Sequence, residues 1–336
     1  MLHFNYVFFN YMEAGLWKKN YDGYYAICVR DLESLDGLRL VYHPLDRKPY
    51  LLRLLFAIHN SRKLSLHVNV PFKELWYPLY FKDDFKNDLP YCFIAQDYLP
   101  KGYIKYLKEM YPNCKIIKIT RDLVRTQKRL FNSYYYDNTY DIWMSFDEKD
   151  SIEYNMVYFP EFESKIDVPV SKNYPISDVF FAGRAKDRLP RLVQVYDKLS
   201  NAGISCFFYI LGVPKEMQIN RKGIVYSNKP LSYKQMLYYS VNSRCILEVN
   251  QLGAVGYTSR FLEAVMFNKY LITDNTSIVT NRFYNENYMQ VFDNVDSIDI
   301  SRIKSIETID YQYAGEFSPI HLIQQIDDLL TQNGNN

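Results

Sequence analysis

Three cationic residues follow an apolar segment in the second half of the chain. The residues DVFFAG (178–183) lead directly into Arg184, Lys186 and Arg188, with Gly183 just before them. Because glycine has no side chain, the main chain there can approach a ligand closely. Guanidinium and ammonium groups bind phosphate oxygens through charge-assisted hydrogen bonds. The pattern indicates a diphosphate site; the alternative is a solvated loop whose cations hold no ligand.

A second pattern combines glycines with the start of a helix. Gly253 and Gly256 precede Tyr257, Thr258 and Ser259, and helical periodicity begins there. The free N–H groups and partial positive charge of a helix N-terminus favour anions such as phosphate. Thr258 and Ser259 either donate hydroxyl groups to that anion or serve as ordinary N-caps.

Three further charged residues lie near these patterns. Arg260 adds positive charge at the helix start, and Glu263 falls one turn beyond Ser259 on the same face. Glu263 either accepts hydrogen bonds from ribose hydroxyls or pairs with Arg260 at i,i+3 spacing. Glu248 interrupts the apolar strand CILEV. It therefore faces either a cleft or the exposed edge of a sheet.

Several motifs are absent from the sequence. It contains no GxGxxG or Walker loop, which disfavours NAD(P) dehydrogenases and P-loop NTPases. It also lacks Asp-x-Asp, and the five histidines (3, 43, 59, 67 and 321) show no metal-ligand spacing. We therefore expect neither a metal nor a cofactor.

Composition limits the partners and the compartment. The 40 Lys and Arg residues nearly balance the 38 Asp and Glu residues, so the net charge is +2 and no nucleic-acid partner is expected. The five cysteines form no CxxC pair, which is typical of a reduced, cytoplasmic protein. No uncharged apolar run approaches the ~20 residues of a membrane span, and the N-terminus lacks a signal peptide's basic region.

The elements that must position these residues alternate along the chain. In the first block we expect strands at 4–9, 24–29, 38–42, 63–70, 91–95, 115–119 and 141–147, with helices near 49–60, 101–111, 121–133 and 147–154. In the second block we expect strands at 178–183, 206–212, 223–227, 245–250 and 270–275, with helices at 188–202, 232–240, 259–268 and 318–330. This alternation predicts an α/β protein with mostly parallel sheets.

The alternation divides into domains. Pro160, Pro169 and Pro175 lie in a stretch without periodicity, which indicates an interdomain linker. We expect two Rossmann-like βαβ domains facing across a cleft, one at 1–165 and one at 166–312. A C-terminal helix at 313–331 is expected to pack back on the first domain.

The second block resembles the nucleotide-sugar half of GT-B fold glycosyltransferases over about residues 178–280. The resemblance rests on Gly183-Arg184 with Lys186, the glycine loop at 253–258, Glu263-Ala264, and Asn268-Lys269 before YLIT. More narrowly, it is similar to bacterial glycosyltransferases of capsule, O-antigen and other surface-polysaccharide synthesis. The acidic residue that this family commonly carries near the start of the glycine loop is missing.

The resemblance implies a function. The enzyme would move a sugar from a nucleoside-diphosphate sugar to a hydroxyl of a saccharide or lipid-linked saccharide, without a metal. By the resemblance, Arg184 and Lys186 would hold the diphosphate and Glu263 the ribose, and the first domain would bind the acceptor. Without a metal, Arg188 and the helix dipole at 258–260 would also neutralise the charge on the leaving diphosphate. Alternatives are a nucleotide-sugar epimerase or a glycogen-phosphorylase-like enzyme on the same fold, and a non-catalytic nucleotide- or sugar-binding subunit.

Two features of the first block bear on this function. A general base would come from Asp97, which follows the strand at 91–95, with His67 and Glu13 as other candidates. The apolar segment 47–63 is flanked by cations, and Arg121, Arg125 and Arg129 recur at i,i+4. These segments form either a core helix with a solvated face or a peripheral contact with the inner membrane face.

Overall fold

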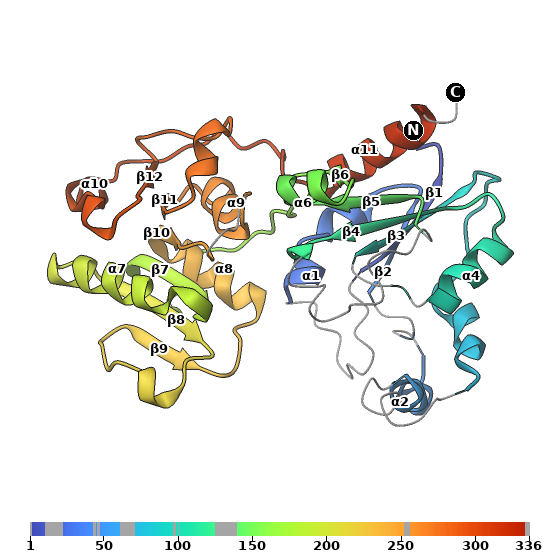
Figure 1. Ribbon diagram of the computed structural model, residues 1–336, viewed down its shortest axis with the longest axis horizontal. Helices are drawn as coiled ribbons and strands as arrows, with labels where there is room; N and C mark the ends of the chain where they lie inside the picture. The colour runs from blue at the N-terminus through green and yellow to red at the C-terminus, as the bar shows by residue number, and fades with distance from the viewer. Residues whose placement is uncertain are drawn as a thin grey trace. The chain divides into compact units, whose positions relative to one another are not determined.

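The chain forms two compact units (Figure 1). Unit 1 comprises Met1–Tyr21, Cys28–Pro160 and Ser318–Asn336, and unit 2 comprises Asp22–Ile27 and Glu161–Phe317. The computed structural model describes residues 2–10, 23–42, 45, 48–60, 71–96, 99, 101–124, 140–251 and 256–332.

Unit 1 contains a six-stranded sheet in the order β2-β1-β3-β4-β5-β6, in which every described pairing is parallel. The strands are β1 (Asn5–Phe9), β2 (Leu38–Val41), β3 (Tyr91–Gln96), β4 (Lys115–Thr120), β5 (Ile142–Ser145) and β6 (Val157–Tyr158). The helical segments are η1 (Arg30–Ser34), α2 (Tyr50–His59), η2 (Lys73–Leu79), α4 (Lys101–Met110), α6 (Glu148–Glu153) and α11 (Pro319–Gln332). β1 and β3 are almost fully apolar and buried, as central strands of parallel sheets require.

The last helix, α11, packs on the first strand of this sheet (Figure 1). The carboxylate of Asp327 accepts the hydroxyl of buried Tyr6 at 2.8 Å and the main-chain N–H of His3 at 2.9 Å. Ser318 caps the helix, since its side-chain oxygen accepts the N–H of Ile320, and Pro319 is the first helical residue. Unit 1 is thus built from chain segments that precede and follow unit 2 in the sequence.

Unit 2 contains a second six-stranded parallel sheet, in the order β12-β11-β10-β7-β8-β9. Its strands are β7 (Ser177–Arg184), β8 (Cys206–Leu211), β9 (Ile224–Ser227), β10 (Ser243–Glu248), β11 (Tyr270–Thr273) and β12 (Met289–Val291). Its helical segments are α1 (Tyr24–Ile27), η3 (Lys186–Arg188), α7 (Leu189–Asn201), η4 (Lys215–Met217), α8 (Tyr233–Val241), α9 (Ser259–Met266), η5 (Thr276–Thr280), η6 (Val295–Ser297) and α10 (Ile300–Lys304).

Local sequence accounts for the helices of unit 2. Ser232 and Gln235 form a reciprocal capping box at the start of α8, with main-chain to side-chain distances of 2.9 and 3.2 Å. Along α7, Leu192, Val195 and Leu199 recur at helical spacing and are fully buried in the core. The α/β architecture with parallel sheets predicted from the sequence is confirmed.

One expected strand is a helix. The segment 24–29 contains α1, in which Gly23 accepts the N–H groups of Ala26 and Ile27. Ile27 packs with Tyr233 and Leu237 of α8. A short apolar run fits a strand or a buried helix equally well, so tertiary packing decides the outcome here.

The remaining expected elements were located with two exceptions. The strand expected at 63–70 lies outside the described residues, as does most of the helix expected at 121–133. The sequence did not reveal β12, which has only three residues. No helix in the described parts of the chain is long and apolar enough to cross a membrane.

Candidate functional site

The two sequence patterns meet where the strand order of unit 2 reverses. From β7 the chain runs outward through β8 to β9, and it then returns to place β10 on the other side of β7. In open parallel sheets, ligands bind beyond the carboxyl ends of the strands at such a switch point. The cation segment (residues 184–188) follows β7, and the glycine loop (residues 249–258) follows β10.

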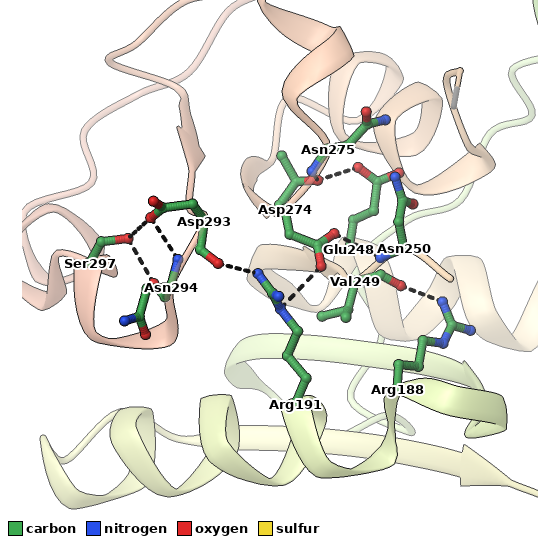
Figure 2. A network of polar contacts seen from close by, with 11 residues as sticks. Arg188, Arg191, Glu248, Val249, Asn250, Asp274, Asn275, Asp293, Asn294 and Ser297 are labelled. Carbon is green, nitrogen blue, oxygen red and sulfur yellow. Dashed lines mark hydrogen bonds and ion pairs between the residues drawn. The ribbon is translucent and has the colours of Figure 1, made fainter. Parts of the chain in front are cut away.

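Side chains of the cation segment bind the glycine loop directly. Arg188 donates from Nη1 to the carbonyl of Val249 (Figure 2). It also donates from Nε and Nη2 to the carbonyl of Arg184, at 3.1 and 3.0 Å. Lys186 Nζ donates to Gln251 Oε1 at 2.8 Å. The exposed side chain of Arg184 has no hydrogen-bond partner among the described residues. Arg188 therefore joins the two segments, while Arg184 and Lys186 face solvent.

Gly183 makes room for the Arg188 guanidinium. A Cβ atom at this position would lie 3.0 Å from Arg188 Nη2 and 3.2 Å from Phe181 Cζ. The guanidinium lies 5.5 Å from the centre of the Phe181 ring, in a cation–π contact. Burial lowers the pKa of Arg188 from its ordinary value. A side chain at position 183 would therefore require small shifts of the Arg188 and Phe181 side chains.

The start of α9 has one hydroxyl engaged and one available. Thr258 is the N-cap: its Oγ1 accepts the N–H of Arg260 at 3.1 Å, and its hydroxyl donates to Glu248. The side chain of Ser259 forms no hydrogen bond in the described part of the chain and is partly exposed. Tyr257 stacks on Phe261 at 5.1 Å. Thr258 is therefore structural, and Ser259 is free to donate to a ligand.

Glu248 does not lie at a sheet edge. It ends β10, which pairs with both β7 and β11, and only 2% of its surface is exposed. Its carboxylate accepts the hydroxyl groups of Thr258 and Thr273. Burial raises the pKa of Glu248, and these two hydrogen bonds oppose that effect. The carboxylate thus ties the N-cap of α9 to the end of β11.

Arg260 and Glu263 form a buried pair rather than an exposed one. Arg260 Nη1 donates to Glu263, which is 0% exposed and also accepts the hydroxyl groups of Tyr233 (2.9 Å) and Ser240 (3.0 Å). Burial raises the pKa of Glu263, and the Arg260 charge opposes that rise. Glu263, which was expected to contact ribose, is thus enclosed within unit 2 and pairs with Arg260 in the first turn of α9.

Sequence reasoning missed a polar network beside these segments (Figure 2). Asp274 accepts the main-chain N–H of Asn250 at 2.7 Å and lies 3.2 Å from Arg191 Nε. Asn275 donates from Nδ2 to the carbonyl of Gly256 at 2.8 Å. The only available signal was the polar triplet TDN directly after the apolar strand YLI.

A pocket of about 500 Å³ opens at the same edge of the sheet. It lies beyond the ends of β8 and β9, next to the cation segment in strand order. Its lining consists of Gly212, Val213, Pro214, Lys215, Gln218, Tyr226, Ser227 and Asn228. The main-chain groups and one aromatic ring suit a planar, hydrogen-bonding ligand.

Unit 1 has a switch point of its own, between β1 and β3. Gln96 ends β3 with 3% exposure, and neither its amide nitrogen nor its amide oxygen has a hydrogen-bond partner among the described residues. Buried amides are normally hydrogen-bonded, so this group is suited to a ligand that both donates and accepts. Asp97, His67, Glu13 and Gly253 lie outside the described residues.

The described residues contain no group of three or more His, Cys, Asp or Glu side chains arranged to hold a metal ion. No protein-family model matches the sequence, and no curated protein matches it either.

Solved structures match the chain in fold. An α-glucosyltransferase in complex with UDP-glucose and DNA containing an abasic site is 14% identical, with a TM-score of 0.57, over 97% of this chain and 99% of that one. An α-glucosyltransferase in complex with UDP and a 13-mer DNA containing an HMU base is 12% identical, with the same TM-score and coverage. The chain therefore has the two-sheet α/β fold of the GT-B enzymes.

Proposed function

We propose that this protein is a metal-independent glycosyltransferase. It moves a sugar from a nucleoside-diphosphate sugar to a hydroxyl of a saccharide or lipid-linked saccharide during surface-polysaccharide synthesis. The observation that carries the proposal is the contact between the cation segment and the glycine loop. Arg188 and Lys186 bind Val249 and Gln251 across the switch point, so two segments suited to phosphate lie side by side.

The geometry supports stabilisation of a diphosphate leaving group. Negative charge develops on the diphosphate as the bond to the anomeric carbon breaks, so preorganised cations and N–H groups lower the barrier. Arg184 and Lys186 are exposed at this edge. Ser259, whose side chain forms no hydrogen bond within the described residues, begins the helix that follows the glycine loop. In the proposal, Arg188 and Thr258 hold the segments in place, Tyr257 and Arg260 support the start of α9, and Gly183 leaves space for Arg188.

Glu263 supports the donor site through buried contacts rather than by facing the ligand. Its carboxylate fixes Arg260 and Tyr233, so it keeps the first turn of α9 in place. A direct bond to ribose would require the carboxylate to exchange one of these partners for a hydroxyl. The pocket beyond β8 and β9 is the volume in which a nucleobase fits next to the diphosphate.

The acceptor side belongs to unit 1 in this proposal. The amide of Gln96, which has no hydrogen-bond partner among the described residues, lies at the switch point of the first sheet, where sugar hydroxyl groups would satisfy both of its polar atoms. Asp97, the next residue, is the proposed general base that accepts the proton of the attacking hydroxyl.

A lipid-linked acceptor would place the protein at a cytoplasmic membrane face, and α2 offers a suitable surface. Leu51, Leu55 and Ile58 recur at i, i+4 and i+7 and are 64%, 49% and 53% exposed. Lys48 and Arg53 lie beside them in the sequence. An apolar helical stripe flanked by cations favours the surface of an anionic bilayer.

Nucleotide binding provides the first test. We expect UDP, or one of GDP, dTDP and CMP, to stabilise the protein by about 2.7 kcal/mol at one hundred times its dissociation constant, with EDTA making no difference. Arg184→Ala and Lys186→Ala should each weaken that binding about tenfold, the value of one charge-assisted hydrogen bond. Lys304→Ala, an exposed cation on α10, is the matched control.

Transfer of the sugar distinguishes the enzyme from its alternatives. Asp97→Asn should abolish transfer while nucleotide affinity stays at the wild-type value. Binding without turnover would indicate a regulatory subunit instead. Epimerization is less favoured because the 161–317 segment of unit 2 contains no histidine. Transfer to a DNA duplex, the ligand class of the structural neighbours, would overturn the saccharide acceptor.

A further inference from the structure

Three consecutive residues at the carboxyl end of β11 contact the structure around the glycine loop. Thr273 donates its hydroxyl to Glu248, which ends β10 just before the loop. Asp274 accepts the N–H of Asn250 at 2.7 Å (Figure 2), and Asn275 donates to the carbonyl of Gly256 at 2.8 Å. Because Asn250 and Gly256 lie near opposite ends of the loop, both of its ends are fixed to the same strand.

Asp274 also reaches the helix that follows the cation segment. Its second carboxylate oxygen lies 3.2 Å from Arg191 Nε in α7. Arg191 is held in turn by the carbonyl of Asp293 at 2.8 Å (Figure 2). Its guanidinium also lies 5.1 Å from the centre of the Phe292 ring. The Asp274 side chain thus contacts both the start of the glycine loop and the first turn of α7.

These side chains are too enclosed to bind a ligand themselves. Asn275 is 4% exposed, and the Asp274 side chain is 11% exposed. Buried polar groups of this kind usually bind partners within the protein. Here those partners are the main-chain N–H of Asn250, the carbonyl of Gly256 and the side chain of Arg191. These residues can therefore affect a ligand only by holding the two ends of the loop in place.

We propose that Asp274 and Asn275 are positioning residues that hold the two ends of the glycine loop, at Asn250 and Gly256, where a diphosphate binds. The inference rests on the proposed function, because it names how that same site is organised. The bonds to Asn250 and Gly256 fix where the loop leaves β10 and where it enters α9. The ion pair with Arg191 ties the first turn of α7, which directly follows the cation segment, to the same residue.

Two nearly isosteric variants remove single bonds. Asn275→Asp loses the donor to Gly256 but keeps the oxygen that caps Ser277 at 3.1 Å. Asp274→Asn keeps an acceptor for Asn250 and loses the ion pair with Arg191. The matched control is Asn281→Asp, in the same segment, whose side-chain oxygen accepts the N–H of Phe283 at 2.9 Å and has no hydrogen bond to the described residues of the loop. Circular dichroism verifies that each variant is folded.

Calorimetry with UDP and with uridine separates positioning from general damage; GDP and dTDP with their nucleosides serve likewise. We expect both variants to raise the dissociation constant for the diphosphate about 10- to 100-fold, because small misplacements at a binding site are costly. The nucleoside affinity and the Asn281→Asp control should change less than twofold. An unchanged diphosphate affinity, or an equal loss for diphosphate and nucleoside, would overturn the inference.

Hydrogen exchange of the ligand-free protein makes the inference independent of the proposed function. If Asp274 and Asn275 hold the two ends of the loop, the amide of Asn250 should exchange at least tenfold faster in Asp274→Ala than in the wild type, because the acceptor of that amide is gone. Exchange in residues 256–258 should likewise accelerate in Asn275→Asp. Wild-type protein that binds no nucleoside diphosphate would overturn the proposed function, whereas unchanged exchange would overturn the inference.

Discussion

Glu248 is an ionisable residue that is deeply buried, so the stability of the folded state depends on pH. It is 2% exposed, and burial raises its pKa above the ordinary value of 4.5 that it regains when the chain unfolds. Between the unfolded and the folded pKa, the folded state therefore binds more protons than the unfolded state. The stabilizing contribution of Glu248 is fully present below pH 4.5 and is lost as the pH rises through the folded pKa.

Glu248→Gln isolates this contribution. Glutamine can still hydrogen-bond to Thr258 and Thr273 but does not ionise, so the wild type should lose stability relative to the variant as the pH rises. Urea unfolding of both proteins at pH 4.5 and at pH 7.5 measures the difference in free energy of unfolding. A difference that is constant across this range would mean that Glu248 does not titrate on folding.

The sequence could identify the residues that face the ligand better than those that hold them. Arg184, Lys186 and Ser259 follow strands or begin a helix, and the rule about carboxyl ends applies to any parallel sheet. The roles of Asp274 and Arg191 depend on β11 lying next to β10. Strand order is set by the packing of the whole sheet, so the sequence near these residues does not contain it. The enclosure of Glu263 was likewise invisible, because it depends on Tyr233 and Ser240 of α8.

At the scale of elements, the outer face of α2 makes a prediction about membranes. Leu55→Glu should reduce binding to vesicles that contain anionic lipid about tenfold, because it removes an inserted apolar side chain and adds repulsion. Vesicle sedimentation at low ionic strength measures the effect. Ile152→Glu on α6, where the side chain is 79% exposed, is the matched control. Equal loss in both variants would remove α2 as the contact face.

Elements were predicted best where the pattern was long and its ends were marked. α7 and α11 show clear helical spacing, and α11 begins with Ser318 and Pro319. The segment at 24–29 gave the wrong element because six apolar residues carry no period, and the decision comes from contacts with α8. β12 is shorter than any pattern that alternation could reveal.

At the scale of the whole molecule, unit 1 depends on α11. Asp327→Ala leaves the hydroxyl of buried Tyr6 without its acceptor, which should cost about 1–3 kcal/mol. All three tryptophans (17, 76 and 143) belong to unit 1, so tryptophan fluorescence reports the unfolding of that unit. Asp328 is exposed on the same helix, so Asp328→Ala should leave the unfolding transition followed by tryptophan fluorescence unchanged. A shift of equal size in both variants would contradict the role of Asp327.

The composition of unit 1 also sets an order of events during synthesis. Domains generally fold as the ribosome releases them, with the N-terminal one first. Here the strands of the first sheet emerge early, but α11 follows residues 161–317 and cannot cover β1 until they have left the ribosome. The face of β1 that carries Tyr6 therefore lacks its cover while unit 2 is being made. The nascent chain should complete its second unit before its first, and chaperones would meet the first sheet with that face open.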